Sequence, residues 1–452
     1  MELERPEIMR PNLHLMKATL TGALGGLLFG FDTIVISGAI DALVRLYGLS
    51  AQGKGLTVAI GLVGTVVGAL GAGVVGQRLG GREALRLTAI LYVVSAIGCG
   101  LAWNWPSFML FRFVGGLGIG ASSVLGPVYI AELAPAKWRG RLVGMFQFNI
   151  VTGILLAYVS NYWIRTLQLG ATEWRWQIGI SVLPAFGFLL LLFGIPKSPR
   201  WSASRNQIDD ALAVLKLIGE PDPKTELDDI RAALEQEHAS AHEPVFQWKY
   251  RYPLFLAISI GAFNQLAGIN AILYYLPNIF SSAGFSQISG DQQAIAIGFT
   301  NLIFTMVGMS VIDKLGRKTL LLVGAAGTAG CLAGVAWLFK THSHPGALVW
   351  ILVTYIAFFA LSQGAVIWVY IGEVFPNSVR SKGQGVGNAS HWIMNTVIAL
   401  EFPVVVHFLN TETPFVFFAV MTMVQFLVVL IAYPETKGET LEALQRRFVS
   451  SD

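Results

Sequence analysis

The sequence has few charged residues and almost no cysteine. Of its 452 residues, 13% are charged and 54% are hydrophobic, and two are cysteines, Cys99 and Cys331. Because soluble domains carry about a quarter charged residues, this composition excludes an ordinary water-soluble protein. The cysteines lie in apolar runs, so we expect small hydrophobic side chains and no disulfide. The 7 histidines are scattered, and no nucleophile–base set or metal cluster is recognisable, so we expect no enzymatic activity, cofactor or metal.

Long apolar runs make up most of the chain. A helix of about 20 apolar residues crosses the hydrocarbon core of a bilayer, and lipid permits only helices or closed barrels as spanning structures. Barrel strands would alternate at period two over about ten residues, whereas these runs are longer and continuously apolar. We therefore predict an all-α membrane protein with spans at 16–40, 54–77, 85–103, 107–131, 142–165, 176–196, 252–281, 292–312, 318–340, 347–372, 383–408 and 415–433.

The loops between these spans predict the orientation. Lys and Arg gather after the second, fourth, eighth and tenth spans, and none follows the third, seventh or eleventh span. Cytoplasmic loops carry the excess of Lys and Arg. We therefore expect a multi-pass protein of the cell (inner or plasma) membrane with both termini in the cytoplasm.

Three segments of the first half of the sequence recur in the second half. Residues 129–141 match residues 370–382, residues 77–82 match 313–318, and residues 196–199 match 434–437, all in the same order and at nearly the same spacing. This repetition indicates an internal duplication, which is typical of transporters built from two half-bundles. We predict two pseudo-symmetric six-helix bundles at 1–196 and 251–434, short cytoplasmic linker helices at 197–250, and a cytoplasmic tail at 435–452.

One carboxylate lies in the middle of the first predicted span. Asp32 has apolar neighbours, and Arg112 near the start of the fourth span is its obvious partner. A charge inside a membrane is costly and marks a functional site by default. Burial favours a neutral carboxyl group and a nearby guanidinium favours the charged form, so a movement that separates them changes proton affinity. We predict that Asp32 and Arg112 couple the protein to protons; the alternative is a static ion pair between two helices.

Amide and aromatic side chains form a second candidate site. We expect it to comprise Gln147, Asn264, Gln265, Asn270, Tyr274, Trp368, His391 and Trp392. Amides donate and accept hydrogen bonds, which suits a ligand with many hydroxyl groups, and an indole packs on the apolar face of a sugar ring. An anionic ligand would need several unpaired cations inside the bundle. The alternatives are hydrogen bonds between helices and ordinary core packing.

The duplicated loops also carry charges at helix ends. We predict an intracellular gate made of Glu132, Arg139, Arg317, Glu373 and Arg380. Exposed pairs add little stability, but pairs that form in one conformation and break in another shift the equilibrium between conformations. The alternative is that these charges only set the topology of the chain.

With these residues the sequence resembles the sugar porter family of the major facilitator superfamily over nearly its whole length. The motifs that carry the resemblance are residues 139–141, 196–201, 265–270, 313–318 and 434–438. The resemblance implies twelve helices, alternating access and a central sugar site formed mostly by the second half. By position, the sugar contacts of the family correspond to Gln147, Gln265, Asn270, Tyr274, Trp368 and Trp392. Asp32 with Arg112 resembles the proton-coupling pair of its bacterial symporters.

Five positions depart from the family pattern. Asn264 stands where the first of two glutamines is usual, and His391 where Gln or Asn is common. Ala365 replaces the proline of a Gly-Pro pair in the tenth span, which questions the hinge expected there. Gly81 replaces an arginine and Lys197 replaces a glutamate near the expected inner gate, so that gate is expected to be weaker.

The sequence thus predicts a proton-coupled importer of a monosaccharide, a hexose or a pentose. We expect a monomer in a lipid bilayer whose partners are the sugar and the proton, with no nucleic acid. The first alternative is an uncoupled facilitator with the same site. A sugar sensor that does not transport is less favoured, because the tail after Tyr433 is short.

Overall fold

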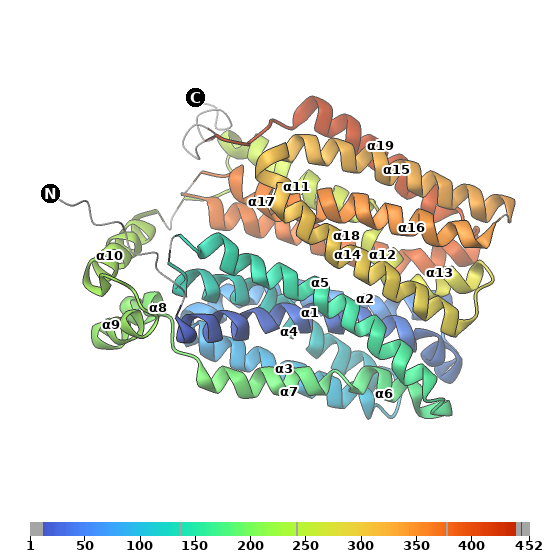
Figure 1. The fold of residues 1–452 in the computed structure, drawn as a ribbon, viewed down its shortest axis with the longest axis horizontal. Coiled ribbons are helices and arrows are strands. Elements are labelled where there is room, and N and C mark those ends of the chain that lie inside the picture. Colours follow the sequence, from blue (N-terminus) through green and yellow to red (C-terminus); the bar gives the residue numbers. More distant parts are fainter. Residues whose placement is uncertain are drawn as a thin grey trace.

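The computed structural model describes residues 12–135, 137–240, 243–342, 344–376, 378–439 and 444. Within these residues, 12 helical spans are long and apolar enough to cross a membrane. They form two bundles that lie side by side, one from each half of the chain (Figure 1). This arrangement confirms the predicted all-α membrane fold with twelve spans.

The N-terminal bundle contains the first six spans. Its elements are α1 (Leu13–Tyr47), α2 (Ala51–Leu79), α3 (Gly81–Gly100), α4 (Trp105–Leu133), α5 (Arg139–Thr166), η1 (Gly170–Thr172), α6 (Glu173–Gly179), α7 (Val182–Leu191) and η2 (Leu192–Gly194). The first helix is longer at both ends than the predicted 16–40. Asn12 caps its start by accepting from the Leu15 amide, and Gly48 ends it with φ 60°, a left-handed conformation that glycine adopts without strain.

The C-terminal bundle contains the other six spans. Its elements are η3 (Trp248–Tyr250), α11 (Arg251–Leu266), α12 (Ile269–Tyr274), α13 (Leu276–Ser282), α14 (Gln287–Leu315), α15 (Arg317–Thr341), α16 (Pro345–Phe359), η4 (Ala360–Gly364), α17 (Ala365–Glu373), α18 (Arg380–Phe408) and α19 (Thr413–Ala432).

The seventh span is discontinuous, which corrects the single helix predicted at 252–281. Gly268 has φ 82° and separates α11 from α12. Tyr275 separates α12 from α13, which begins with a proline in its first turn, where the missing N–H costs nothing. The apolar run predicted one helix because a left-handed glycine looks the same in sequence as a glycine that packs helices.

The tenth span also changes its winding. α16 and α17 are joined by η4, a π-helical turn. A π-turn bonds i to i+5 and is frequent at functional sites. The irregularity therefore lies next to Ala365, where the expected proline is missing, and the span deviates from a regular α-helix without it.

Three short helices link the bundles: α8 (Pro199–Ser204), α9 (Ile208–Leu217) and α10 (Pro223–Ser240). They lie together at one end of the molecule (Figure 1), which we call the linker end; the opposite end is the far end. Leu215, Ile218 and Leu227 are buried in the same apolar cluster as residues of α1 and α4. The linker helices therefore pack on the N-terminal bundle.

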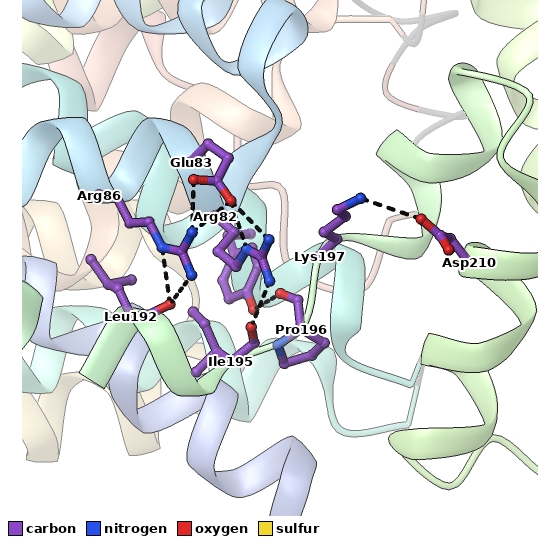
Figure 2. Close-up of polar contacts among 9 residues, drawn as sticks. Arg82, Glu83, Arg86, Leu192, Ile195, Pro196, Lys197 and Asp210 are labelled. Atoms are coloured by element: carbon purple, nitrogen blue, oxygen red, sulfur yellow. Dashed lines mark hydrogen bonds and ion pairs between the residues drawn. The ribbon is translucent and has the colours of Figure 1, made fainter. Parts of the chain in front are cut away.

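Hydrogen bonds fix the linker end of the N-terminal bundle. Arg82 and Arg86 both pair with Glu83, and they donate to the carbonyl groups of Ile195 and Leu192 respectively (Figure 2). These contacts hold the start of α3 against the end of the sixth span.

The two departures at this corner are accommodated differently. A side chain at Gly81 would begin 3.1 Å from the Tyr129 ring, so glycine lets α3 approach α4. Lys197 pairs with Asp210 of α9 at 3.3 Å (Figure 2). Both side chains are largely exposed, so this pair adds little stability. The contacts described for both residues thus lie within the N-terminal half of the chain.

Candidate functional site

Asp32 and Arg112 form an ion pair inside the N-terminal bundle. Arg112 Nη1 lies 3.0 Å from Asp32 Oδ2, and the two side chains are 4% and 7% exposed. The same nitrogen donates to the Asp32 carbonyl oxygen at 3.3 Å. Either charge left alone in a buried place would be strongly destabilising, so each one needs the other. The two predicted coupling residues are therefore in direct contact across α1 and α4.

Two glycines make room for this pair. A Cβ at Gly61 of α2 would lie 3.3 Å from Arg112 Nη2, and a Cβ at Gly115 of α4 would lie 2.4 Å from Ser95 Oγ and 3.6 Å from Asp32 Oδ2. Arg112 Nε is buried and has no hydrogen-bond partner within the described chain. The guanidinium is thus closely packed, and its Nε–H is a buried donor without a partner among the described residues.

The predicted amide cluster assembles at the break between α11 and α12. Gln265 Nε2 donates to Asn264 Oδ1 at 2.9 Å, and Asn270 Nδ2 donates to Gln265 Oε1 at 3.0 Å. Both ring nitrogens of His391 in α18 lie 3.3 Å from Gln265 Nε2. The left-handed Gly268 turns the chain so that residues on either side of it meet in one network.

A second polar contact lies between α12 and α18. Asn395 Nδ2 donates to the Tyr274 hydroxyl at 3.1 Å, while Asn395 Oδ1 and Trp392 Nε1 are buried and unpaired among the residues described. Asn395 was not predicted, although it follows His391 by four residues and so lies on the same helix face. Buried polar atoms without partners are rare in native proteins, and here they adjoin the amide cluster.

Aromatic rings surround His391 and connect the two bundles. The ring of His391 lies 5.0 Å from that of Trp368 and 5.1 Å from that of Trp392. The Trp392 ring in turn lies 5.4 Å from that of Phe29 in α1. Phe29 precedes Asp32 by less than one helical turn. One aromatic contact therefore joins the helix of the buried carboxylate to the amide cluster.

Gln147 is the one predicted ligand contact that belongs to the N-terminal bundle. It lies in α5 and is half-buried. Its side chain shows no hydrogen bond to the described residues, so it is not part of the hydrogen-bond network of Gln265 and His391.

The sequence of the chain matches a known family. Residues 18–448 match the family model described as "Sugar (and other) transporter". The chain belongs to the sugar porter family of the major facilitator superfamily. It is therefore a transporter and not an enzyme.

Relatives of this sugar porter are similar over nearly their whole length. The arabinose-proton symporter of Bacillus subtilis (strain 168) is 34% identical, with 98% of this chain and 99% of the relative covered. The inward open conformation of the xylose transporter XylE from E. coli gives a TM-score of 0.86 at 32% identity, covering 96% of this chain and 100% of that one. The proton:xylose symporter XylE bound to 6-bromo-6-deoxy-D-glucose gives 0.80 at 32% identity, covering 96% and 99%.

In this sugar porter, the contacts seen for Glu373 lie within the C-terminal half of the chain. Glu373 accepts from Arg317 at 2.8 Å and from Thr436 at 2.6 Å, and Arg317 also pairs with Asp313 at 2.9 Å. Arg380 Nε donates to the Phe375 carbonyl oxygen at 3.2 Å. Glu132 and Arg139 lie at the end of α4 and the start of α5, at the same end of the molecule.

At the far end of the sugar porter, charged residues connect the two bundles. Arg165 of α5 pairs with Asp291 of α14, and it also pairs with Glu173 at 3.2 Å and donates to the Gly38 carbonyl oxygen at 3.1 Å. Asp291 is 3% exposed and Arg165 is 13% exposed. We call Arg165, Asp291 and Glu173 the far-end cluster.

A second set of contacts joins the two bundles near the same end. Asn278 of α13 donates to both carboxylate oxygens of Asp41 of α1 at 2.7 Å, and Lys54 pairs with Asp41 at 3.2 Å. The Tyr158 hydroxyl of α5 also donates to the Leu273 carbonyl oxygen of α12 at 2.7 Å. These contacts hold the bundles together between the amide cluster and the far end.

Proposed function

We propose that this sugar porter imports a monosaccharide, a hexose or a pentose, together with a proton. The observation that carries this proposal is the buried Asp32–Arg112 pair, connected through Phe29 and Trp392 to the amide cluster. The names of the relatives, which are symporters of pentoses and protons, support both substrates.

The amide cluster supplies groups that suit a polyol. Asn264, Gln265 and Asn270 present amides that both donate and accept, while Trp368 and Trp392 present indole faces and N–H groups. His391 in its neutral form offers one donor and one acceptor. Tyr274 and Gln147 complete the proposed set of contacts. Together these residues recognise hydroxyl groups without requiring charge on the sugar.

The coupling step follows from the ion pair. A carboxylate that loses its guanidinium neighbour in a buried place takes up a proton more readily. Movement of α1 against α4 when the bundles rock therefore changes the proton affinity of Asp32. The contact between Phe29 and Trp392 lets sugar binding act on the position of α1.

We propose an orientation in which the linker end and both termini face the cytoplasm of a cell (inner or plasma) membrane. Basic residues at the linker end, such as Arg82, Arg86 and Lys318, support this orientation. Because contacts between the bundles close the far end, we propose that the site is reached from the linker end, in an inward-facing conformation. The higher TM-score to the inward open structure than to the ligand-bound one agrees with this. We further propose that a monomer is the transporting unit, with bundles at 1–196 and 251–434, a linker at 197–250 and a tail at 435–452.

We propose that the gate at the linker end works by exchanging partners. Glu373 pairs with Arg317 in the present conformation. When the linker end closes, Glu132, Arg139 and Arg380 are expected to complete contacts between the bundles. Pairs that exist in only one conformation bias the equilibrium between conformations.

Uptake into proteoliposomes tests the function. We expect a panel of labelled monosaccharides to include one that accumulates when the outside is acidic. Asp32→Asn should abolish uphill accumulation while leaving sugar counterflow, because a neutral amide still fills the position but carries no proton. Asp209→Asn, at an exposed position of the linker helix α9, is the matched control and should keep accumulation.

The alternative function is an uncoupled facilitator. It predicts that sugar influx does not make the medium alkaline, and that Asp32→Asn transports as the wild type does. Accumulation that survives unchanged in Asp32→Asn would overturn the coupling role. A wild type that equilibrates a sugar without concentrating it would favour the facilitator.

A further inference from the structure

The π-turn η4 carries a glutamine that no sequence pattern singled out. Gln363 is 1% exposed, and neither Nε2 nor Oε1 of its side chain has a hydrogen-bond partner within the described chain. Each unpaired buried polar group costs about 1–3 kcal/mol. A native protein that keeps two such unpaired atoms in one side chain calls for an explanation. Gln363 is thus a buried amide with its full hydrogen-bonding capacity unused.

The backbone places Gln363 beside the amide cluster. Asn264 Nδ2 donates to the Gln363 carbonyl oxygen at 3.5 Å. On the same span, the Tyr355 hydroxyl donates to the Ala267 carbonyl oxygen at 2.8 Å, next to the break after α11. Two α-helical turns take about seven residues, and the π-turn adds about one. Gln363 therefore lies on the face of Tyr355, which is directed at the break.

The neighbours of Gln363 occupy the other faces of the span. A Cβ at Gly324 of α15 would lie 1.7 Å from Ser362 Oγ, so Ser362 is directed at α15. A Cβ at Gly308 of α14 would lie 3.0 Å from Ala365 Cβ, so Ala365 is directed at α14. In a regular α-helix the position after Ser362 would be rotated further from the face of Tyr355. The π-turn thus brings an amide to the side where the ligand site is formed.

We propose that Gln363 is a further sugar-contacting residue that helps to determine which monosaccharide is bound. This inference rests on the proposed function. In the occupied site, its amide exchanges hydrogen bonds with sugar hydroxyl groups, and the two unpaired atoms gain partners. A site built to bond a hydroxyl group rejects an analogue that lacks it, because the buried polar atoms of the site are then left unpaired.

Sugar binding and thermal unfolding of the purified full-length transporter test this assignment. The variants are Gln363→Leu, which keeps the size and removes the polar atoms, and Gln363→Asn, which keeps the amide. We expect Gln363→Leu to weaken the Kd of the transported sugar about tenfold, since about 1.4 kcal/mol of hydrogen bonding is lost. Its unfolding temperature without sugar should stay equal or rise, because an unsatisfied group has been removed.

Selectivity gives the second measurement. The panel includes deoxy analogues of the transported sugar, each lacking one hydroxyl group. We expect the wild type to discriminate against one analogue and Gln363→Leu to lose that discrimination, while Gln363→Asn keeps part of it. Gln425 of α19 is another buried glutamine, and its Oε1 has no partner among the described residues. Gln425→Leu should keep the sugar Kd and the selectivity.

The outcomes separate this inference from the proposed function. A wild type that binds a monosaccharide, with Gln363→Leu binding it at the same Kd and selectivity, overturns the role of Gln363 alone. A wild type that binds no sugar of the panel overturns the proposed function and this inference with it. A Gln363→Leu variant that is less stable without sugar and unchanged in Kd shows a structural role, and overturns the inference as well.

Discussion

Replacing Asp291 by asparagine is expected to open the far end of the transporter. In the present conformation Asp291 is 3% exposed and pairs with Arg165 of the other bundle. When the far end opens, the two residues separate and become hydrated. The substitution therefore removes an interaction from the closed conformation and little from the open one, so the equilibrium shifts toward opening.

The structure sets the size of this shift. Removing one partner of a buried pair costs about 3–5 kcal/mol, because the other charge stays buried. Arg165 keeps Glu173 at 3.2 Å and the Gly38 carbonyl oxygen at 3.1 Å as partners. We therefore expect Asp291→Asn to destabilise the closed conformation by less, about 2 kcal/mol. At about 1.4 kcal/mol for each factor of ten, the ratio of closed to open should fall about thirtyfold.

Distances between spin labels measure this ratio. Leu46 at the end of α1 is 55% exposed and Ile288 at the start of α14 is 41% exposed. Spin labels attached to cysteines at these two positions report the distance between the bundles at the far end. The native Cys99 and Cys331 are replaced first. We expect a single short distance in the parent protein and a second, longer one in Asp291→Asn. Asp313→Asn removes the same charge at the linker end, where Asp313 is 81% exposed, and should leave the distance short. Asp291→Asn with the distance distribution of the parent would refute the reasoning.

Two further predictions concern stability in detergent. Gly116→Ala places a Cβ 2.0 Å from the Gly61 carbonyl oxygen, so α2 and α4 must separate at a cost of about 1–3 kcal/mol, which thermal unfolding measures. The control is Gly71→Ala, whose Cβ would have no described neighbour within 4 Å, and it should leave the unfolding temperature unchanged. Hydrogen bonds from Lys249, Tyr250 and Ser378 lower the pKa of Glu243 from 4.5 to about 2. The ionised Glu243 therefore stabilises the folded protein fully above pH 4.5, and this contribution is lost as the pH falls toward 2. Glu243→Gln should unfold at a lower temperature than wild type at pH 7, and a difference that does not shrink below pH 4.5 would contradict this.

The pairing of Asp32 with Arg112 could be predicted from the sequence because both residues have apolar neighbours. Asp32 and Arg112 stand in apolar runs, where a charge is costly, so each one needs a partner and the other is the available one. The amides Asn264, Gln265 and Asn270 were found for the same reason. Their grouping in one span was visible, but their network with His391 was not.

The far-end cluster could not be predicted. Arg165 and Asp291 lie at helix ends, where charges are ordinary in membrane proteins. Nothing in the sequence says which helix ends meet when the bundles pack. The closed far end is a property of how the two bundles are placed relative to each other.

The sequence by itself determined the twelve spans, their duplication and the pairing of Asp32 with Arg112, because lipid makes polarity expensive and so makes each polar residue informative. The tertiary structure alone decided where the helices break, at Gly268 and in the π-turn that carries Gln363. It also decided that the two bundles make contact at the far end. These features depend on the local backbone conformation and on contacts between distant helices, which the spacing of residues along the chain does not encode.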